Sequence, residues 1–348
     1  MTYLLLTFAF AFNLLCIGAK KKSKIVTVFS IIVLSVLFGG NNLNADYNAY
    51  LLNYRLVGTG NSYFDFDPFF NVLMKIGTNL NLEYNVFLTI ICLFCYTLLF
   101  GLLYKRNGYK IHSVIMLYMI YSFFIDAVQV SNFVSNIMAI IFIYLMFEYR
   151  KNSSKRILIL SVIFLTLAIG FHVSSIVLVP FYFFSKSKRT NILAIGAIIF
   201  ACADTLLGHS IINVLFGIIP HFRAYANLTF YSLSINSGWG FLLYICLILI
   251  MIGLIKCFDQ EEKNKDILNL LQYILVLTPV MVISTISYTR FFRVLMIVYS
   301  GFYNTLSARY YKKDLKIYLA VVAIFVFLFF REVGMDNFYD IMNNNFYF

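Results

Sequence analysis

The sequence has few charged residues and no polar stretch long enough to form a separate soluble domain. Only 12% of its 348 residues are charged, whereas 61% are hydrophobic. A soluble chain of this composition would expose far more apolar surface than water-facing proteins carry. The composition therefore excludes a soluble globular protein and predicts one integral membrane domain over residues 1–348.

Motifs of several common enzyme classes are also missing. There is no P-loop, no HExxH, no GxSxG and no dinucleotide-binding fingerprint. The four histidines are scattered, without the spacing of a zinc site. The six cysteines do not indicate a disulfide framework, because most of them lie inside apolar runs where packing explains them. The sequence thus predicts no cofactor.

Apolar runs, by contrast, recur along the whole chain. They lie near residues 2–18, 25–39, 84–104, 111–125, 132–149, 156–170, 173–184, 191–207, 237–257, 267–285, 290–308 and 315–331. Basic residues follow the first run instead of preceding it, the reverse of a signal peptide, so we expect a retained first span. The runs predict an all-α polytopic membrane protein with about 12 transmembrane helices, within a range of roughly 10–14.

The basic residues predict the sidedness of these spans. The net charge of +12 does not indicate nucleic-acid binding, because most Lys and Arg residues form short clusters between apolar runs. If the N-terminus lies outside, the successive inner loops carry these clusters, as the positive-inside rule requires. The basic residues outside those loops are Arg55, Lys75, Arg223, Arg290, Arg293 and Arg331. This pattern predicts that both termini lie outside.

The same rule predicts a break within residues 156–184. Two short helices that meet at Gly170-Phe171-His172 preserve the alternation of the loops, whereas one long span inverts it. Short spans that meet within a bilayer need a protein-lined or wet cavity for their backbone ends. We therefore expect a recessed cavity open to the outside, with His172 at the tip.

Two long outer loops, residues 40–83 and 208–236, are the remaining extended segments. Apolar residues recur at helical spacing in both, which predicts amphipathic helices that lie along the outer membrane surface or cover a cavity. These residues are Phe69, Phe70, Leu73, Ile76, Ile211, Ile212, Leu215, Ile218 and Ile219. The inner loops are short, so we expect the functional groups on the outer side.

Ionisable residues on that side are candidates for chemistry, because charge at membrane depth is costly. His172 is either a general base or anion donor, or a histidine bonded to backbone where two helices end. Arg290 and Arg293 are three residues apart, which places both guanidinium groups on one helical face and suits a phosphate. The alternative is a pair of snorkelling headgroup anchors.

Other polar residues suit a sugar. In the first outer loop, the Asp46 carboxylate can bond sugar hydroxyls and the nearby tyrosine rings can pack on a sugar ring. The alternative is that the tyrosines form an aromatic belt at the membrane interface and that Asp46 is solvated. A second set lies at the tip between two spans, where helix capping is the alternative. These candidate sugar contacts are Tyr47, Tyr50, Tyr54, Asp126, Gln129 and Asn132. Asp65-Phe-Asp67 matches a DxD metal motif, but so short a pattern is common by chance, and we do not favour a divalent metal.

The chain resembles the EpsG/Wzy-type family of bacterial exopolysaccharide, capsule and O-antigen polymerases. The resemblance rests on four segments in the expected order. They are Asp46-Tyr47-x-x-Tyr50, Asp67-Pro-Phe-Phe-Asn-Val-Leu-Met-Lys75, Asp126-Ala-Val-Gln129-Val-Ser-Asn132-Phe133, and Gly170-Phe-His172-Val-Ser-Ser175 followed by Pro180. One departure is Ser131, where the family often carries Arg; if that Arg touches a diphosphate, its role passes here to Arg290, Arg293 or Arg223.

The resemblance implies a fold similar to the GT-C membrane glycosyltransferases. It also implies polymerisation of undecaprenyl-diphosphate-linked repeat units on the outer face of the bacterial cytoplasmic membrane, alongside a flippase and a chain-length regulator. Asp46, His172, Arg290 and Arg293 are the expected catalytic residues. The expected substrate contacts are Tyr47, Tyr50, Arg55, Asp67, Asp126, Gln129, Asn132 and Arg223. Two other functions remain open: a flippase of the same lipid-linked oligosaccharide, and a membrane acyltransferase that modifies the polysaccharide.

Overall fold

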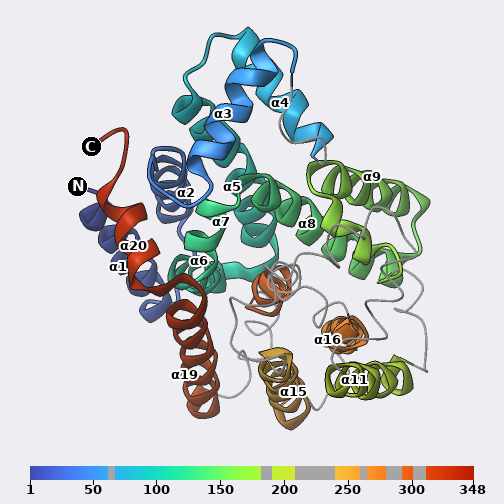
Figure 1. Ribbon diagram of the computed structural model, residues 1–348. Coiled ribbons are helices and arrows are strands. Elements are labelled where there is room, and N and C mark those ends of the chain that lie inside the picture. Colours follow the sequence, from blue (N-terminus) through green and yellow to red (C-terminus); the bar gives the residue numbers. More distant parts are fainter. Residues whose placement is uncertain (62–66, 182–189, 208–239, 259–264, 280–291, 301–310) are drawn as a thin grey trace. The chain divides into compact units, whose positions relative to one another are not determined.

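The computed structural model describes residues 1–61, 67–181, 190–207, 240–258, 265–279, 292–300 and 311–348. The regular structure of these residues is helical, apart from one isolated backbone bridge between Asn41 and Asn345. The predicted all-α class is therefore confirmed for this part of the chain (Figure 1). The chain divides into two compact units, Met1–Ile176 with Ile297–Phe348, and Val177–Met296. The prediction of one membrane domain stays a prediction.

Most of the described helices belong to the first unit. They are α1 (Thr2–Gly18), α2 (Lys24–Gly39), α3 (Tyr47–Gly58), α4 (Pro68–Asn79), α5 (Tyr84–Asn107), η1 (Gly108–Lys110), α6 (Ile111–Ile120), α7 (Ser122–Val128), α8 (Val130–Asn152), α9 (Lys155–Phe171), α19 (Tyr311–Leu328), η4 (Phe329–Val333) and α20 (Gly334–Asn343). The short 3₁₀-helix η2 (Val173–Leu178) follows α9 across the boundary between the units.

Helix α8 forms the core of the first unit. Every residue from 130 to 144 is buried, and the helix packs most extensively against α9 and also against α5. Its polar side chains Ser131, Asn132 and Ser135 are enclosed together with the apolar ones. Its first turns therefore hold their side chains in fixed positions against neighbouring helices.

Helices α2 and α5 approach closely where α2 ends. A Cβ atom added to Gly39 would lie 2.5 Å or less from the backbone N and Cα of Thr89. Small residues at helix interfaces allow such backbone contact. The side-chain amide of Asn85 in α5 also donates to the carbonyl oxygen of Gly39, over 2.8 Å, and so ties the two helices together.

The predicted span 111–125 is interrupted. Tyr121 has φ −131° and ψ −65°, which separates α6 from α7. The Tyr121 hydroxyl donates to the carboxylate of Glu332 in η4, a single π-helical turn. This bond connects the break to the C-terminal part of the chain, a long-range contact that sequence periodicity does not register.

The first outer loop contains two helices: α4, which its periodicity predicts, and α3, which the sequence did not indicate. In α4, Pro68 occupies the first turn, where its missing N–H costs nothing, and the apolar side chains of Phe70 and Met74 are buried. Helix α3 packs against α4, and the Asn53 amide donates to Asn71 Oδ1 over 2.9 Å. The paired helices form one end of the first unit, seen at the top of Figure 1.

The C-terminal segment forms an additional amphipathic helix, α20, beyond the last predicted span. It lies beside α1 (Figure 1), and the Thr2 hydroxyl donates to the carbonyl oxygen of Met342. The chain then returns to the end of α2, where the Phe346 N–H donates to the Gly40 carbonyl over 2.6 Å. The residues at the two ends of the sequence therefore pack within the same unit.

The second unit is described more sparsely. Its labelled helices are α11 (Thr190–Leu206), α15 (Gly240–Phe258) and α16 (Lys265–Val276), and residues 292–296 begin another helical stretch. Helix α16 packs against both α11 and α15. Two ionisable side chains of this unit, Asp204 and Arg293, are fully buried.

Two described helical stretches, Tyr84–Ile120 and Val130–Asn152, are long and apolar enough to cross a membrane. Four shorter helices are also apolar: Thr2–Gly18, Lys24–Gly39, Thr190–Leu206 and Phe241–Lys256. The apolar helices agree with a membrane protein. The predicted number of spans and the GT-C-like arrangement stay predictions.

Candidate active site

Asp67 and His172 form a hydrogen-bonded pair in the first unit. The Asp67 Oδ1 and His172 Nδ1 atoms are 2.8 Å apart, and the two side chains are only 10% and 16% exposed. They come from positions 105 residues apart in the sequence. A carboxylate at Nδ1 favours the imidazole with hydrogen on that atom, so Nε2 carries the lone pair and is the atom that accepts a proton.

Local structure positions both members of this pair. Asp67 is the N-cap residue of α4, immediately before Pro68. His172 follows the last residue of α9 and has an extended backbone, with φ −157° and ψ 122°. The predicted helix break at this residue is therefore confirmed, and it turns the imidazole out of the helical repeat.

Aromatic packing holds the two helix ends together. Phe69 and Phe171 meet edge to face with their ring centroids 5.9 Å apart. Gly170 permits this approach, because a Cβ atom there would lie 2.3 Å from Phe69 Cδ2. The glycine in the Gly170-Phe171-His172 segment therefore has a specific packing role beside the Asp67–His172 pair.

Tyr50 of α3 connects this pair to the start of α8. Its hydroxyl lies 2.9 Å from Ser131 Oγ, and its ring meets Phe70 edge to face at 5.8 Å. Burial raises the pKa of Tyr50 to about 12, although the hydrogen bond to Ser131 opposes this effect. The hydroxyl is therefore protonated at neutral pH. The negative charges of Asp67 and Asp46 both raise the pKa of Tyr50 as well, so they act on the same tyrosine.

A second pair of hydroxyl groups attaches the segment after His172 to α8. Ser135 Oγ lies 2.7 Å from Ser175 Oγ and also donates to the Ala168 carbonyl over 2.7 Å. This bond places the segment Val173–Ser175 along the buried helix. The sequence did not point to Ser135, because a serine inside an apolar span carries no visible signal.

The other residues of the first outer loop line the same end of the unit. Asp46 is the N-cap residue of α3, and its N–H donates to Asn44 Oδ1 over 3.0 Å. The Tyr47 hydroxyl donates to Asn85 Oδ1 over 2.9 Å, whereas Arg55 is exposed in the last turn of α3. Asp46, Tyr47 and Arg55 are therefore at least partly accessible, unlike the ring of Tyr50.

The residues predicted at the tip between spans differ in accessibility. Asp126 is buried and accepts a 2.9 Å hydrogen bond from the Tyr118 hydroxyl. Gln129, between α7 and α8, is half-buried, and its Oε1 accepts a 3.2 Å bond from the Asn132 amide. The Asp126 side chain therefore lies in the interior of the first unit, and Gln129 is the more accessible candidate for contact with a sugar hydroxyl.

The arginines predicted to bind a diphosphate are only partly described. Arg223 and Arg290 lie outside the described residues. Arg293 belongs to the second unit and is fully buried. Within the described residues, therefore, only Arg293 of the predicted diphosphate contacts has a known environment.

The described residues contain no group of three or more side chains suited to hold a metal ion. Asp65 of the DxD motif lies outside the described residues, and Asp67 accepts a hydrogen bond from His172 when Nδ1 carries the proton. The structure thus gives Asp67 a partner that the sequence did not indicate.

Residues from all four sequence segments meet in one unit: Tyr50, Asp67, Ser131, and His172 with Ser175. A model of the EpsG family matches residues 24–346, nearly the whole chain. The chain belongs to the EpsG family. Membership in this family, together with the apolar helices, identifies a membrane protein with a role in polysaccharide polymerisation.

We also compared the chain with curated proteins and with solved structures. Neither comparison found a match. The substrate and the reaction of this EpsG-family protein are therefore inferred from its own residues.

Proposed function

We propose that this EpsG-family protein polymerises undecaprenyl-diphosphate-linked oligosaccharide repeat units on the outer face of the bacterial cytoplasmic membrane. The observation that carries the proposal is the Asp67–His172 pair, in the unit where residues of four family-like segments meet. The expected multi-pass topology, with both termini outside, supports the outer face as the side of the reaction.

His172 is the proposed general base. A sugar hydroxyl of the incoming lipid-linked unit attacks the anomeric carbon of the growing chain, and its proton passes to His172 Nε2. The bond from the anomeric carbon to the lipid diphosphate breaks, and the diphosphate leaves with the bonding electrons. A positioned base contributes about 10²–10⁴-fold to such a step.

Asp67 is the proposed positioning residue for that base. Its carboxylate fixes the imidazole through Nδ1 and stabilises the imidazolium that forms when Nε2 takes the proton. This role replaces the direct sugar contact expected for Asp67, because its Oδ1 lies against His172. Asp46, the other candidate base, keeps a proposed role at the sugar.

Charge on the departing diphosphate needs cationic groups, and Arg290, Arg293 and Arg223 are the proposed sources. Arginine offers a planar fork to phosphate oxygens, and preorganised donors are worth most where charge develops. Arg55 in α3 is exposed and suits the acceptor's diphosphate. Tyr47, Tyr50, Asp126, Gln129 and Asn132 complete the proposed substrate site as direct contacts or as supports for them.

We propose that the reaction needs no divalent metal. Arginine side chains stabilise the negative charge on the leaving diphosphate, and His172 accepts the proton of the acceptor hydroxyl. Polymerisation by the purified protein is therefore expected to continue at an unchanged rate after treatment with EDTA. A rate that falls with EDTA and returns with added Mg²⁺ or Mn²⁺ would contradict this part of the proposal.

A gel of lipid-linked glycans from cells that lack this protein tests the function as a whole. Single repeat units on the outer face, with no ladder of longer products, are the expected result. Repeat units trapped inside the cell would overturn the proposal in favour of a flippase. A normal ladder that lacks only an acyl group would overturn it in favour of an acyltransferase.

A further inference from the structure

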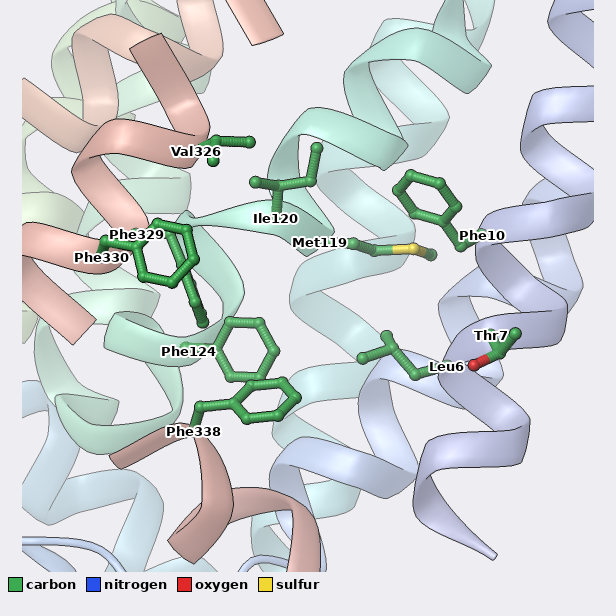
Figure 2. A pocket seen from close by; sticks show the side chains of 10 residues that line it. All are labelled: Leu6, Thr7, Phe10, Met119, Ile120, Phe124, Val326, Phe329, Phe330 and Phe338. Atoms are coloured by element: carbon green, nitrogen blue, oxygen red, sulfur yellow. The ribbon is translucent and has the colours of Figure 1, made fainter. Parts of the chain in front are cut away.

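The first unit contains an apolar groove away from the Asp67–His172 pair. Its volume is about 390 Å³, within the range of roughly 300–1,000 Å³ that is usual for ligand pockets. Figure 2 shows side chains from four parts of the chain around it. The lining residues are Leu6, Thr7, Phe10, Met119, Ile120, Phe124, Val326, Phe329, Phe330 and Phe338.

Three aromatic rings form one side of the groove. The centroid of Phe124 lies 5.5 Å from Phe329 and 5.2 Å from Phe338, and the latter two are 5.8 Å apart. Leu6 and Phe10 of α1, with Met119 of α6, lie across from these rings (Figure 2). Among the lining side chains only Thr7 carries a hydroxyl, amide or charged group, so the groove suits a hydrocarbon better than a polar headgroup.

The groove forms where two helices depart from regular geometry. Helix α6 ends at Ile120, and α19 continues into the single π-helical turn η4, which supplies Phe329 and Phe330. The hydrogen bond from Tyr121 to Glu332 connects these two irregular points. π-Helical turns occur frequently at functional sites, where they redirect side chains out of the helical repeat.

The predicted topology places the groove in the outer half of the membrane. Its lining residues come from the start of the first span, from the ends of the spans 111–125 and 315–331, and from α20 beyond the last span, all predicted on the outer side. Phe330 is 61% exposed, so the groove reaches the surface of the protein at this residue. This is the side on which the proposed reaction takes place.

Helix α7 connects the groove to the candidate active site. Phe124 near its start lines the groove, and Gln129 immediately after its end belongs to the site. The helix has 7 residues, which corresponds to a length of about 10 Å. A single lipid-linked molecule can therefore reach both places, with its sugar near Gln129 and its chain along the rings.

We propose that this groove binds part of the polyprenyl chain of a lipid-diphosphate-linked substrate. The inference rests on the proposed function, because it assigns the place of that substrate's lipid. A bulk phospholipid acyl chain has similar chemistry, but only the lipid-linked substrate has a reason to lie at both ends of α7.

Photo-crosslinking on the wild-type protein tests the proposal directly. The probe is a polyprenyl diphosphate with a diazirine near the end of its chain, added to the protein in phosphatidylcholine nanodiscs. The expected labels fall on residues 6–10, 119–124 and 326–330, and excess unlabelled undecaprenyl diphosphate removes them. Labels confined to other residues would overturn the groove assignment. Labels that excess phosphatidylcholine removes and undecaprenyl diphosphate does not would overturn it in favour of bulk lipid.

A matched pair of variants in α1 gives a second test. Leu6→Trp fills the groove, whereas Leu4→Trp adds the same bulk at an exposed residue of the same helix that does not line it. Leu6→Trp is expected to raise the KM for an undecaprenyl-linked substrate about tenfold, the equivalent of losing the burial of about two methylenes. Its KM for a carrier with two isoprene units is expected to match that of Leu4→Trp.

Equal KM values of the two variants for the long-chain substrate would contradict the proposal. This failure is distinct from a failure of the proposed function. In the first case the protein still forms a ladder of products, and in the second case cells without the protein retain a normal ladder.

Discussion

At the scale of single residues, the functional argument depends on which side chains are neighbours. The sequence identified His172 and Asp67 separately, the first as a base or anion donor and the second as a sugar or metal contact. Their 2.8 Å hydrogen bond was not predictable, because it joins two segments whose approach is set by the packing of α4 on α9. Local patterns report only neighbours a few residues apart.

Tyr50 illustrates the same limit. Its motif suggested a ring that packs on a sugar, but the structure buries the ring and pairs its hydroxyl with Ser131. Ser131 is the position at which the family resemblance led us to expect an Arg. Here it supplies a hydrogen-bond partner for Tyr50, which explains how this chain uses a small polar residue at that position.

The pairing makes a residue-scale prediction about stability. Tyr50→Phe keeps the ring and removes the hydroxyl, and Ser131→Ala removes its partner. Each substitution is expected to lower the free energy of unfolding by about 0.5–1.5 kcal/mol, as for a typical buried hydrogen bond. In the double variant the two losses should not add, because both remove the same bond.

Denaturation of the four proteins in detergent measures this double-mutant cycle. Tyr54→Phe is a suitable comparison, because the Tyr54 hydroxyl donates to the Leu82 carbonyl and does not contact Ser131. Combined with Ser131→Ala, it is expected to be additive. Additive losses for the Tyr50→Phe and Ser131→Ala pair would show that their hydrogen bond does not contribute to stability.

At the scale of elements, apolar runs and helical spacing predicted much of what is observed. Helices α1, α2, α5, α8 and α9 coincide with predicted spans to within a few residues. The amphipathic pattern of residues 69–76 correctly predicted α4, and the break before His172 is present. These features are local, so the pattern of side chains along the chain determines them.

Other elements were missed for identifiable reasons. The interruption at Tyr121 lies within a continuous apolar run, and the π-turn η4 lies across the end of another. The two are joined by the Tyr121–Glu332 bond, which spans 211 residues of sequence. Helix α20 was not predicted, because it carries polar residues such as Asp336 and Asn337 on an exposed face and lies after the last apolar run.

The close approach of α2 and α5 gives an element-scale prediction. Gly39→Ala places a methyl group against the Thr89 backbone, which cannot move as a flexible side chain can. We expect it to lower the free energy of unfolding by about 1–3 kcal/mol, as overpacking does. Thermal unfolding of the purified protein in detergent measures the change.

Gly101→Ala is the matched control for this substitution. Gly101 lies within α5, and a Cβ atom added there would meet no atom of a neighbouring described helix within 4 Å. Alanine is the better helix former, so this variant is expected to be stabilised by up to about 1 kcal/mol. If both substitutions lower the melting temperature equally, the close contact at Gly39 is not the cause.

At the scale of the whole molecule, the positive-inside pattern is the basis for the outer location of the site. It makes a prediction that labelling can check with two exposed asparagines, Asn48 in α3 and Asn152 at the end of α8. In a background without native cysteines, Asn48→Cys is expected to react in intact cells with a membrane-impermeant maleimide. Asn152→Cys is expected to react only after the cells are opened. The reverse labelling would contradict the sidedness and with it the proposed outer reaction.

The central claim is that the Asp67–His172 pair performs glycosyl transfer, and reconstitution tests it most directly. Purified protein in liposomes receives lipid-linked repeat units, and the rate of linkage formation is measured for wild type, His172→Ala, Asp67→Asn and the exposed-residue control Asp336→Asn. The account predicts a loss of about 10²–10⁴-fold for His172→Ala. It predicts a loss of up to about 10²-fold for Asp67→Asn, which misplaces the base, and a rate near wild type for Asp336→Asn. A wild-type rate of chain growth from His172→Ala would contradict it.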